Sequence, residues 1–590
     1  MTNGSSTSLL NHFDRIAEAP DAVPRLRRFI LDLAVRGKLV PQDPNDEPAS
    51  ELLKRIKAEK VRLANAGKAK TRQISPSDDR AMLSFDVPKH WACLPLNAIG
   101  TLSGGMTPSK NRLDYWDGEV NWFSPKDIKS EELIVSGMKI TPAGVSETGL
   151  QLYRPGCLFM VARSGILKRT FPVSINRVAA TVNQDLKVLA PFIKGMERYL
   201  QIALKGMTDF ILGNHVKTGT TVQSLKFEGF EYLPLPLPPN EEQHRIVAKV
   251  DELMALCDQL EAAQTKRERR RDRLVAATLH GLNDGAAISV VDEAGNVAGG
   301  GEIPASDVCS NFENNARFLF NHLPNLITRP EQIKQLRQTI LNLAVRGKLV
   351  PQDPNDEPAS VLLKRIEVEK KNLIKAGEIR KGGDLPQIGD ADISLRPPSS
   401  WEWVRLGSIG DWGSGSTPPR GNSEYYDGGI PWLKSGELED RTDLKGSEET
   451  VSEIAISKCS FRKNKPGDVL IAMYGATIGK LAILGESAVT NQAVCGCTPF
   501  DGVYNRYLFL YLLSRRSNFH AQSEGGAQPN ISKIKIINSP FPLPPLAEQH
   551  RIVVKVDELM ALCDELEVRI TSSSTTRYQL LDAALAEVLA

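Results

Sequence analysis

The sequence LAVRGKLVPQDPNDEPAS occupies residues 33–50 and returns at residues 343–360 without one difference. A second block, EQHRIVAKVDELMALCD at 242–258, returns at 548–564 with one substitution. Most of the sequence between these blocks does not match. The chain therefore contains two copies of one plan, which predicts a molecule with a pseudo-twofold internal repeat. The period, about 310 residues, is far longer than that of a solenoid protein.

The second repeated block has the apolar spacing of a long helix. Its apolar residues follow one another at steps of four and three, which is typical of the a/d seam of a coiled coil. Asn240 and Gln243 predict a capping box at the start of the first such helix. The first repeated block reads as a helix, a proline-rich loop and a second helix. We expect the seam to pair helices and to dock partners; it consists of Ile246, Val250, Leu253, Cys257 and Leu260 in the first copy and Ile552, Val556, Leu559, Cys563 and Leu566 in the second.

Between the repeated segments lie two modules rich in Gly, Pro, Trp and β-branched residues. Short runs such as CLFMVA (157–162) and DVLIAM (468–473) predict strands within them. The predicted fold class is α+β, with two small mixed α/β modules separated by long antiparallel coiled-coil helices. We expect the part 11–67 to pack with the distal helix. The expected segments are 1–85 (N-terminal helical repeat), 86–238 (module 1), 239–282 (central long helix), 283–312 (flexible linker), 313–395 (second helical repeat), 396–545 (module 2) and 546–590 (distal long helix).

Composition limits the classes of protein that the chain can belong to. With 590 residues it is too long for one hydrophobic core. A net charge of +2 gives no overall signature of nucleic-acid binding, so any basic surface has to be local. The sequence has neither an apolar run of membrane-spanning length nor a secretory signal, which predicts a cytoplasmic protein. Eight cysteines do not suggest a disulfide framework, and Cys495 and Cys497 read as buried thiols of a strand.

Several strings look like catalytic motifs but lack necessary parts. GATIGKL (475–481) has three residues between its glycines, where a phosphate-binding P-loop has four, and no Ser or Thr follows its lysine. NSPF (538–541) lacks the paired prolines of an amino-methyltransferase loop. His244 and His550 lie at helix starts without a nucleophile or a second His in register. We therefore expect no catalytic, cofactor-binding or metal-binding residues in this chain.

The order helix, module, helix, repeated once, resembles that of the specificity (S) subunit of type I restriction–modification systems. The openings of the modules, GGMTPSKNRLDYWDGEVNWFSPKDI (104–128) and GSGSTPPRGNSEYYDGGIPWLKSGEL (413–438), are similar to the start of the target recognition domains of that family. GGAQPNISKIKI (525–536) also fits. The chain departs from the pattern by carrying a full helical copy before the first recognition domain.

The resemblance implies a non-catalytic, sequence-specific DNA-binding subunit of a host-defence complex. Each recognition domain would read one half of a bipartite, asymmetric site in double-stranded DNA. The helices would space the domains and dock two methyltransferase (modification) subunits, and motor-nuclease (restriction) subunits would join the complex. S-adenosylmethionine, ATP and Mg²⁺ are expected on those partners, and no cofactor is expected on this chain.

The candidates for DNA contact are polar residues of the modules. Phosphate contacts position a protein on DNA, whereas Arg and Lys suit guanine and Asn and Gln suit adenine. Module 1 offers Lys110, Arg112, Lys126, Arg163, Lys168, Arg169 and Lys217; module 2 offers Arg420, Lys434, Tyr474, Lys480, Gln528 and Asn530. Trp122 and Trp432 are expected in the core rather than as stacking platforms.

Two other functions fit parts of the sequence. A coiled-coil interaction scaffold that presents two non-DNA binding modules is favoured by the low net charge. A band-shift assay distinguishes this scaffold from a DNA-binding subunit, because a scaffold would not retain one DNA sequence in preference to others. A fused methyltransferase–specificity chain would need a further catalytic domain, for which no span of the sequence is left.

Overall fold

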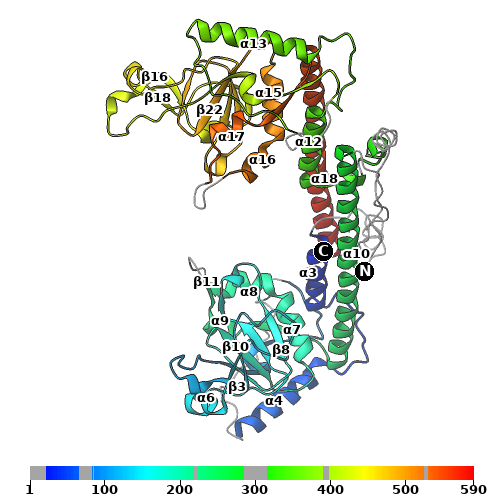
Figure 1. The fold of residues 1–590 in the computed structure, drawn as a ribbon. Helices are drawn as coiled ribbons and strands as arrows, with labels where there is room; N and C mark the ends of the chain where they lie inside the picture. The colour runs from blue at the N-terminus through cyan, green and yellow to red at the C-terminus, as the bar shows by residue number, and fades with distance from the viewer. Residues whose placement is uncertain are drawn as a thin grey trace. The chain divides into compact units, whose positions relative to one another are not determined.

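The computed structural model describes residues 21–65, 83, 85–217, 219, 222–284, 315–319, 321–323, 325–389, 398–523 and 529–589. Nearly all of the expected linker 283–312 lies outside these residues. The chain divides into two compact units. Each unit contains one module and one set of repeated helices (Figure 1). Unit 1 comprises Met1–Arg267 with Ser574–Ala590, and unit 2 comprises Glu268–Ser573.

Four helical segments form the frame of unit 1. Ile30 and Ala34 share one hydrophobic core with Ile246 and Val250. The apolar stripe of the helix that contains Ile30 therefore faces that of the helix that contains Ile246, as the spacing of their apolar residues predicts. The four segments are α3 (Ala22–Val35), α4 (Ala49–Asn65), the first part of α10 (Asn240–Asp284) and the last part of α18 (Leu546–Leu589).

The end of α18 completes this frame. Ala22 of α3 packs against the buried side chain of Leu581. Arg25 forms an ion pair of 2.5 Å with Asp582, and its guanidinium lies 5.0 Å from the ring centre of Tyr578. The expected contact between the N-terminal helical segment and the distal helix is confirmed. Helix α3 contacts α10 as well, so it joins two helices rather than one.

Module 1 consists of a five-stranded mixed sheet with smaller sheets at its margins. The five strands follow the order β2-β10-β6-β8-β4. Where the chain enters and leaves the module, β1 pairs antiparallel with β13. The strands are β1 (Ala92–Pro95), β2 (Gly100–Gly104), β3 (Trp116–Phe123), β4 (Glu132–Leu133), β5 (Met138–Ile140), β6 (Leu158–Val161), β7 (Arg163–Ser164), β8 (Val173–Asn176), β9 (Ala180–Val182), β10 (Leu186–Pro191), β11 (Val216–Lys217), β12 (Gln223–Leu225) and β13 (Pro234–Leu237).

The centre of the five-stranded sheet is apolar on both faces. All four side chains of β6 are buried, because this strand lies between β10 and β8. A continuous apolar run is the expected signal of such a strand. Helix α7 covers β8 and also contacts α3, which attaches the module to the frame (Figure 1). The helices of the module are α5 (Leu96–Ile99), α6 (Pro142–Thr148), α7 (Glu197–Gly206), α8 (Thr208–His215) and α9 (Phe227–Phe230), with 3₁₀ turns η2 (Leu113–Tyr115) and η3 (Gly165–Lys168).

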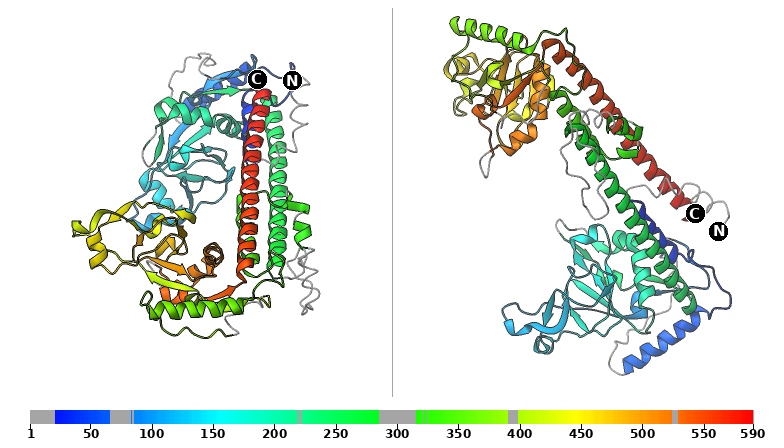
Figure 2. Two further views of the ribbon diagram at one scale, coloured as in Figure 1. Left: turned by 90° about the horizontal axis from the view of Figure 1, so that it is seen from above. Right: turned by 45° about the vertical axis from the view of Figure 1, so that its right-hand side comes forward.

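The frame of unit 2 repeats that of unit 1. Ile333 of α12 (Pro330–Val345) shares a core with Ile552 and Val556 of α18, and α13 (Ala359–Lys375) follows α12. The end of α10 completes this frame, because Val275 joins the same core. In the views of Figures 1 and 2, the parts of α10 and α18 that belong to unit 2 lie side by side and run in opposite directions.

Module 2 has the fold of module 1. Its five-stranded sheet follows the equivalent order β15-β22-β19-β20-β17, and β14 pairs antiparallel with β23 at its ends. The strands are β14 (Glu402–Arg405), β15 (Gly410–Ser414), β16 (Tyr426–Leu433), β17 (Arg441–Leu444), β18 (Glu449–Val451), β19 (Val469–Ala472), β20 (Leu481–Leu484), β21 (Val489–Thr490), β22 (Val494–Pro499) and β23 (Pro540–Leu543). The helices are α14 (Glu453–Lys458), α15 (Asn505–Ser514), α16 (Arg516–Ala521) and α17 (Lys533–Ile537), with 3₁₀ turns η5 (Leu406–Ser408), η6 (Ser423–Tyr425), η7 (Ser435–Glu437) and η8 (Gly475–Thr477).

Two expectations about local chemistry have different outcomes. Cys495 and Cys497 are buried in β22, as expected, and burial raises the pKa of Cys495 to about 12. The capping box expected from Asn240 and Gln243 is wrong. Helix α10 already begins at Asn240, and the Gln243 side chain donates a 3.0 Å hydrogen bond to the carbonyl of Pro238. The described helices include none that is long and apolar enough to cross a membrane.

Candidate nucleic-acid interface

Each module has one place where the turn after the central strand meets a segment from the end of the module. In module 1, β7 pairs with β12, which pairs with β11. In module 2, Tyr474 forms an isolated antiparallel bridge with Asn530. We call these places corner 1 (Arg163, Lys168, Arg169 and Lys217) and corner 2 (Tyr474, Lys480 and Asn530). Segments that are distant in the sequence therefore meet at equivalent positions of the two modules.

Corner 1 is strongly basic. The side chains of Arg163, Lys168, Arg169 and Lys217 are exposed, and none makes a hydrogen bond or ion pair within the described part of the chain. The 3₁₀ turn η3 presents Lys168, and the backbone N–H of Arg169 donates a 2.9 Å hydrogen bond to Ile166. The backbone is thus ordered while the four cationic groups stay available. Such a group of cations attracts phosphates.

Corner 2 carries fewer charges. Asn530 and Tyr474 are exposed, and Lys480 is half-buried. The backbone N–H of Gly475 donates a 2.8 Å hydrogen bond to Pro529, and that of Ile531 donates a 2.9 Å bond to Met473. These bonds hold the two segments of the corner together. Gln528, another predicted contact, lies outside the described residues.

The remaining predicted contacts lie near the first long strand of each module. Lys110 and Lys126 are exposed. Arg112 is engaged, because its side chain donates hydrogen bonds of 2.9 and 2.7 Å to Asp114 and lies 4.4 Å from the ring centre of Tyr115. The hydrogen bonds that Arg112 donates to the Asp114 carboxylate raise the pKa of Arg112 above its ordinary value.

In module 2, Glu449 holds two of the predicted contacts. It lies 2.6 Å from Arg420 and 2.6 Å from Lys434. Hydrogen bonds from Arg420 first, and from Lys434 second, lower the pKa of Glu449 to about 2. The guanidinium of Arg420 also lies over the rings of Tyr426 and Trp432. Both cations therefore already have partners within their own module.

Two tryptophans near these residues belong to the core, as expected. Trp122 is 5% exposed and Trp432 is 2% exposed. Their indole nitrogens donate 3.1 Å hydrogen bonds to the carbonyls of Met106 and Ser416, respectively. Neither ring is available for a nucleic-acid base to stack on.

The predicted seam of the long helices is used inside each unit. Ile246, Val250, Cys257, Ile552, Val556 and Cys563 are buried, whereas Leu253, Leu260, Leu559 and Leu566 are half-buried against the same cores. The seam prediction did not include Leu256 and Leu562, which are 51% and 58% exposed. Their signal in the sequence is an apolar residue outside the seam, at the same place in both copies of the repeated block.

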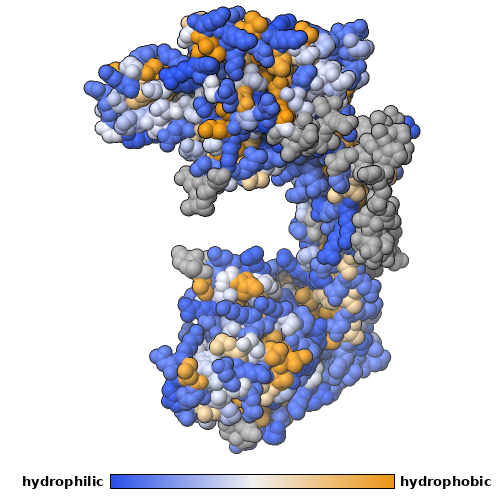
Figure 3. Space-filling model, viewed as in Figure 1, coloured by the Kyte–Doolittle hydropathy of each residue, from blue (hydrophilic) through white to orange (hydrophobic). Residues whose placement is uncertain are grey.

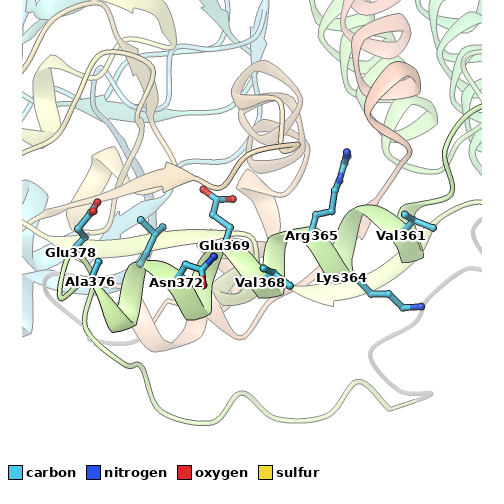
Figure 4. A pocket seen from close by; sticks show the side chains of 9 residues that line it. Val361, Lys364, Arg365, Val368, Glu369, Asn372, Ala376 and Glu378 are labelled. Carbon is cyan, nitrogen blue, oxygen red and sulfur yellow. The ribbon is translucent and has the colours of Figure 1, made fainter.

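No group of three or more His, Cys, Asp or Glu residues within the described ranges could hold a metal ion. A shallow groove of about 610 Å³ follows α13 and is lined by Val361, Arg365 and Val368, among others (Figure 4). On the face seen in Figure 3, hydrophilic side chains dominate each unit, and hydrophobic areas interrupt them.

Comparison with known proteins identifies the family. Residues 88–268 and 398–573 match the family model described as the type I restriction modification DNA specificity domain. The chain is 32% identical over 578 residues to the specificity subunit of the type I restriction enzyme EcoAI of Escherichia coli, with 95% of this chain and 93% of that protein covered. It is 30% identical over 584 residues to the EcoEI specificity subunit of Escherichia coli, with the same shares of 95% and 93%.

One solved structure, whose description concerns complex assembly and conformational transition of the type I R-M system, aligns with this chain with a TM-score of 0.46 and 17% sequence identity. The alignment covers 86% of this chain and 99% of the chain in the solved structure. Each of the two ranges that match the family model takes in one module and the start of the long helix after it. The chain therefore belongs to the specificity subunits of type I restriction enzymes, and its two modules lie in DNA specificity domains.

Proposed function

We propose that this chain is the DNA-binding specificity subunit of a type I restriction–modification complex and that each module reads one half of a bipartite, asymmetric site. Residues 86–238 and 396–545 are the two target recognition domains. The observation that carries the proposal is that the two modules share one fold while their corners present different side chains. A subunit that reads two unlike half-sites needs a common scaffold and different reading residues.

The side chains of the two corners suit different parts of the DNA. The four free cations of corner 1 suit phosphates and guanine edges, because both offer acceptors to guanidinium and ammonium groups. The amide of Asn530 suits adenine, with which an amide forms two hydrogen bonds. Tyr474 bridges to Asn530, Lys480 follows Tyr474 in the same turn, and Gln528 precedes Asn530 in the chain.

The candidate residues outside the corners would bind phosphates or are already paired with carboxylates. Lys110 and Lys126 are exposed and would bind phosphates. Arg112, Arg420 and Lys434 are held by carboxylates, so each would have to exchange a carboxylate for DNA. We therefore rank these three below the residues of the corners.

The repeated helices would bind the protein partners. Leu256 and Leu562 lie exposed at the same position of two nearly identical helical segments, which suits two copies of one partner. We propose that this partner is the modification subunit, which carries S-adenosylmethionine, and that motor-nuclease subunits with ATP and Mg²⁺ complete the complex in the cytoplasm. Helix α10 is 45 residues long, about 68 Å at about 1.5 Å per residue, so it could span neighbouring turns of DNA, about 34 Å each.

Mapping of methylated bases by single-molecule sequencing tests this proposal. Cells that carry the gene for this chain together with its modification subunit should methylate a two-part, asymmetric motif throughout the genome. The methylation should disappear when only this chain is deleted. Methylation that persists without the chain, or methylation without a sequence motif, would refute the proposed function.

A further inference from the structure

Corner 1 presents an apolar side chain among its four cations. Ile166 of the turn η3 is 41% exposed and lies between Arg163 and Lys168 in the sequence. The segments 163–170 and 216–226, which form the corner, contain no Asp or Glu. A single exposed isoleucine is ordinary on a protein surface. This one lies within a group of cations that suits DNA, where an apolar side chain adds nothing to the attraction of phosphates.

The backbone of the turn holds Ile166 in one position. Its N–H donates a 3.4 Å hydrogen bond to the hydroxyl of Ser164, and its carbonyl accepts bonds of 2.9 Å from Arg169 and 3.1 Å from Thr170. The next side chain, that of Leu167, is buried in the core of the module. The turn therefore buries one apolar side chain and leaves its neighbour exposed in a fixed place.

The small sheet of the corner supports the turn. Strand β7, directly before η3, pairs Arg163 with Ser224 of β12, and β12 pairs Ser224 with Lys217 of β11. Residues directly opposite each other in antiparallel strands have their side chains on the same face, so Arg163 and Lys217 lie in one row. Strand β12 also contacts η3. A surface that is ordered before binding loses less entropy when it binds.

The equivalent turn of module 2 shows that the fold does not require an isoleucine at this place. In η8 the carbonyl of Thr477 accepts a 2.9 Å hydrogen bond from Lys480, as that of Ile166 does from Arg169. The hydroxyl of Thr477 donates a 2.7 Å hydrogen bond to the carbonyl of Tyr474. One turn thus carries an apolar side chain and the other a polar one at the same position, which suits two domains that read unlike half-sites.

The chemistry of the base edges limits what an isoleucine can read. Guanine, adenine and cytosine offer hydrogen-bond donors and acceptors in the major groove, and an isoleucine side chain can bind none of them. Thymine also offers its C5-methyl group, which an apolar side chain contacts favourably. The cations of the corner can bind the phosphates on either side and so hold the duplex against the turn.

We propose that Ile166 is a specificity-determining residue of module 1 and that its side chain contacts the C5-methyl group of one thymine in the half-site that this module reads. The inference rests on the proposed function, because it takes module 1 to be a target recognition domain. It assigns one A·T pair of the half-site to one side chain. Arg163, Lys168 and Lys217 position the DNA backbone for this contact.

Replacement of thymine by deoxyuridine tests the contact, because it removes the methyl group and leaves base pairing unchanged. The full chain, assembled with its modification subunit, is titrated with duplexes of the methylated motif in which each thymine is replaced in turn. Ile166→Ser removes the apolar contact, and Ile166→Val keeps it. The matched control is Ile134→Ser, which changes an isoleucine that is 65% exposed directly after the edge strand β4.

One uracil position should weaken binding by about fourfold in the wild-type complex, the effect of one buried methyl group. Ile166→Val and Ile134→Ser should show the same weakening at that position. Ile166→Ser should bind the thymine duplex more weakly and should bind the thymine and uracil duplexes equally well there, with the other positions unchanged.

Two results would overturn the proposal and leave the proposed function intact. One is that Ile166→Ser abolishes the effect of uracil at no position of the motif. The other is a half-site of module 1 that contains no specified A·T pair. A wild-type complex that does not prefer the motif to a scrambled duplex would overturn the proposed function as well.

A crosslinking measurement does not depend on the affinity of the variants. A benzophenone amino acid introduced at Ile166 should crosslink the DNA within the half-site of module 1, and the same group at Ile134 should not. Crosslinks from Ile134 alone, or none from either position, would overturn the proposal.

Discussion

The indole nitrogen of Trp401 donates a 2.9 Å hydrogen bond to the carboxylate of Glu548, and both side chains are buried. The bond joins the start of module 2 to the start of α18. Unit 1 repeats it between Trp91 and Glu242 at 3.0 Å. The repeated EQHRIV segment thus anchors its own module, in addition to forming a helix.

The first prediction concerns the strength of this anchor. Trp401→Phe removes the donor and leaves a buried carboxylate with one partner fewer, which should lower the free energy of unfolding by about 1–3 kcal/mol. Trp403→Phe is the matched control, because its indole nitrogen is buried without a hydrogen-bond partner among the described residues. Urea denaturation followed by circular dichroism measures both variants. If Trp401→Phe and Trp403→Phe lost the same stability, the loss would come from the smaller ring alone and the hydrogen bond would contribute nothing.

The second prediction concerns pH. Burial raises the pKa of Glu548 above its ordinary value of 4.5, so the folded chain binds this proton more tightly than the unfolded chain does. Its contribution to stability is therefore present below pH 4.5 and is lost as the pH rises through the raised pKa. Glu548→Gln removes this dependence. The melting temperature of the variant, relative to wild type, should rise from pH 4 to pH 8; a constant difference would contradict the assignment.

The third prediction concerns corner 1. If Lys168 and Arg169 contact phosphates, replacing either by Ala should weaken binding to all DNA sequences. Each replacement should also reduce the slope of log affinity against log salt concentration by about 0.9. The control is Lys57→Ala, which removes an exposed lysine of α4. Fluorescence anisotropy of the assembled complex at several salt concentrations gives the slopes, and unchanged slopes in both corner variants would exclude phosphate contact there.

The fourth prediction concerns corner 2. Asn530→Ala should weaken binding to the recognised site by about 1–3 kcal/mol and should leave the salt slope unchanged, because an amide that contacts a base releases no counterions. It should also relax the choice of base at one position of the half-site read by module 2. Competition binding with single-base variants of the site measures this. A uniform loss of affinity over all variants would indicate a structural role instead.

Local patterns in the sequence predicted the elements of the fold well. The steps of four and three place Ile246 and Val250 in the core, and the runs CLFMVA and DVLIAM contain the buried strands β6 and β19. These signals are strong because one element alone determines which of its side chains face inwards.

Pairings between distant segments could not be predicted in the same way. The sequence offered Arg420 as a candidate for DNA contact, whereas Glu449, 29 residues later, binds it from strand β18 of a small sheet. Arg25 meets Asp582 over a separation of 557 residues. The bridge between Tyr474 and Asn530 likewise depends on how the module closes. Such contacts are decided by tertiary structure, and no local periodicity reports them.

Exchange of one module tests the central claim most directly. Residues 398–545 would be replaced by the corresponding module of another specificity subunit, and methylated bases would be mapped by single-molecule sequencing. We predict that one half of the methylated motif changes, while the other half and the distance between the halves stay the same. A motif in which both halves change together, or in which neither changes, would contradict the claim that each module reads its own half of the site.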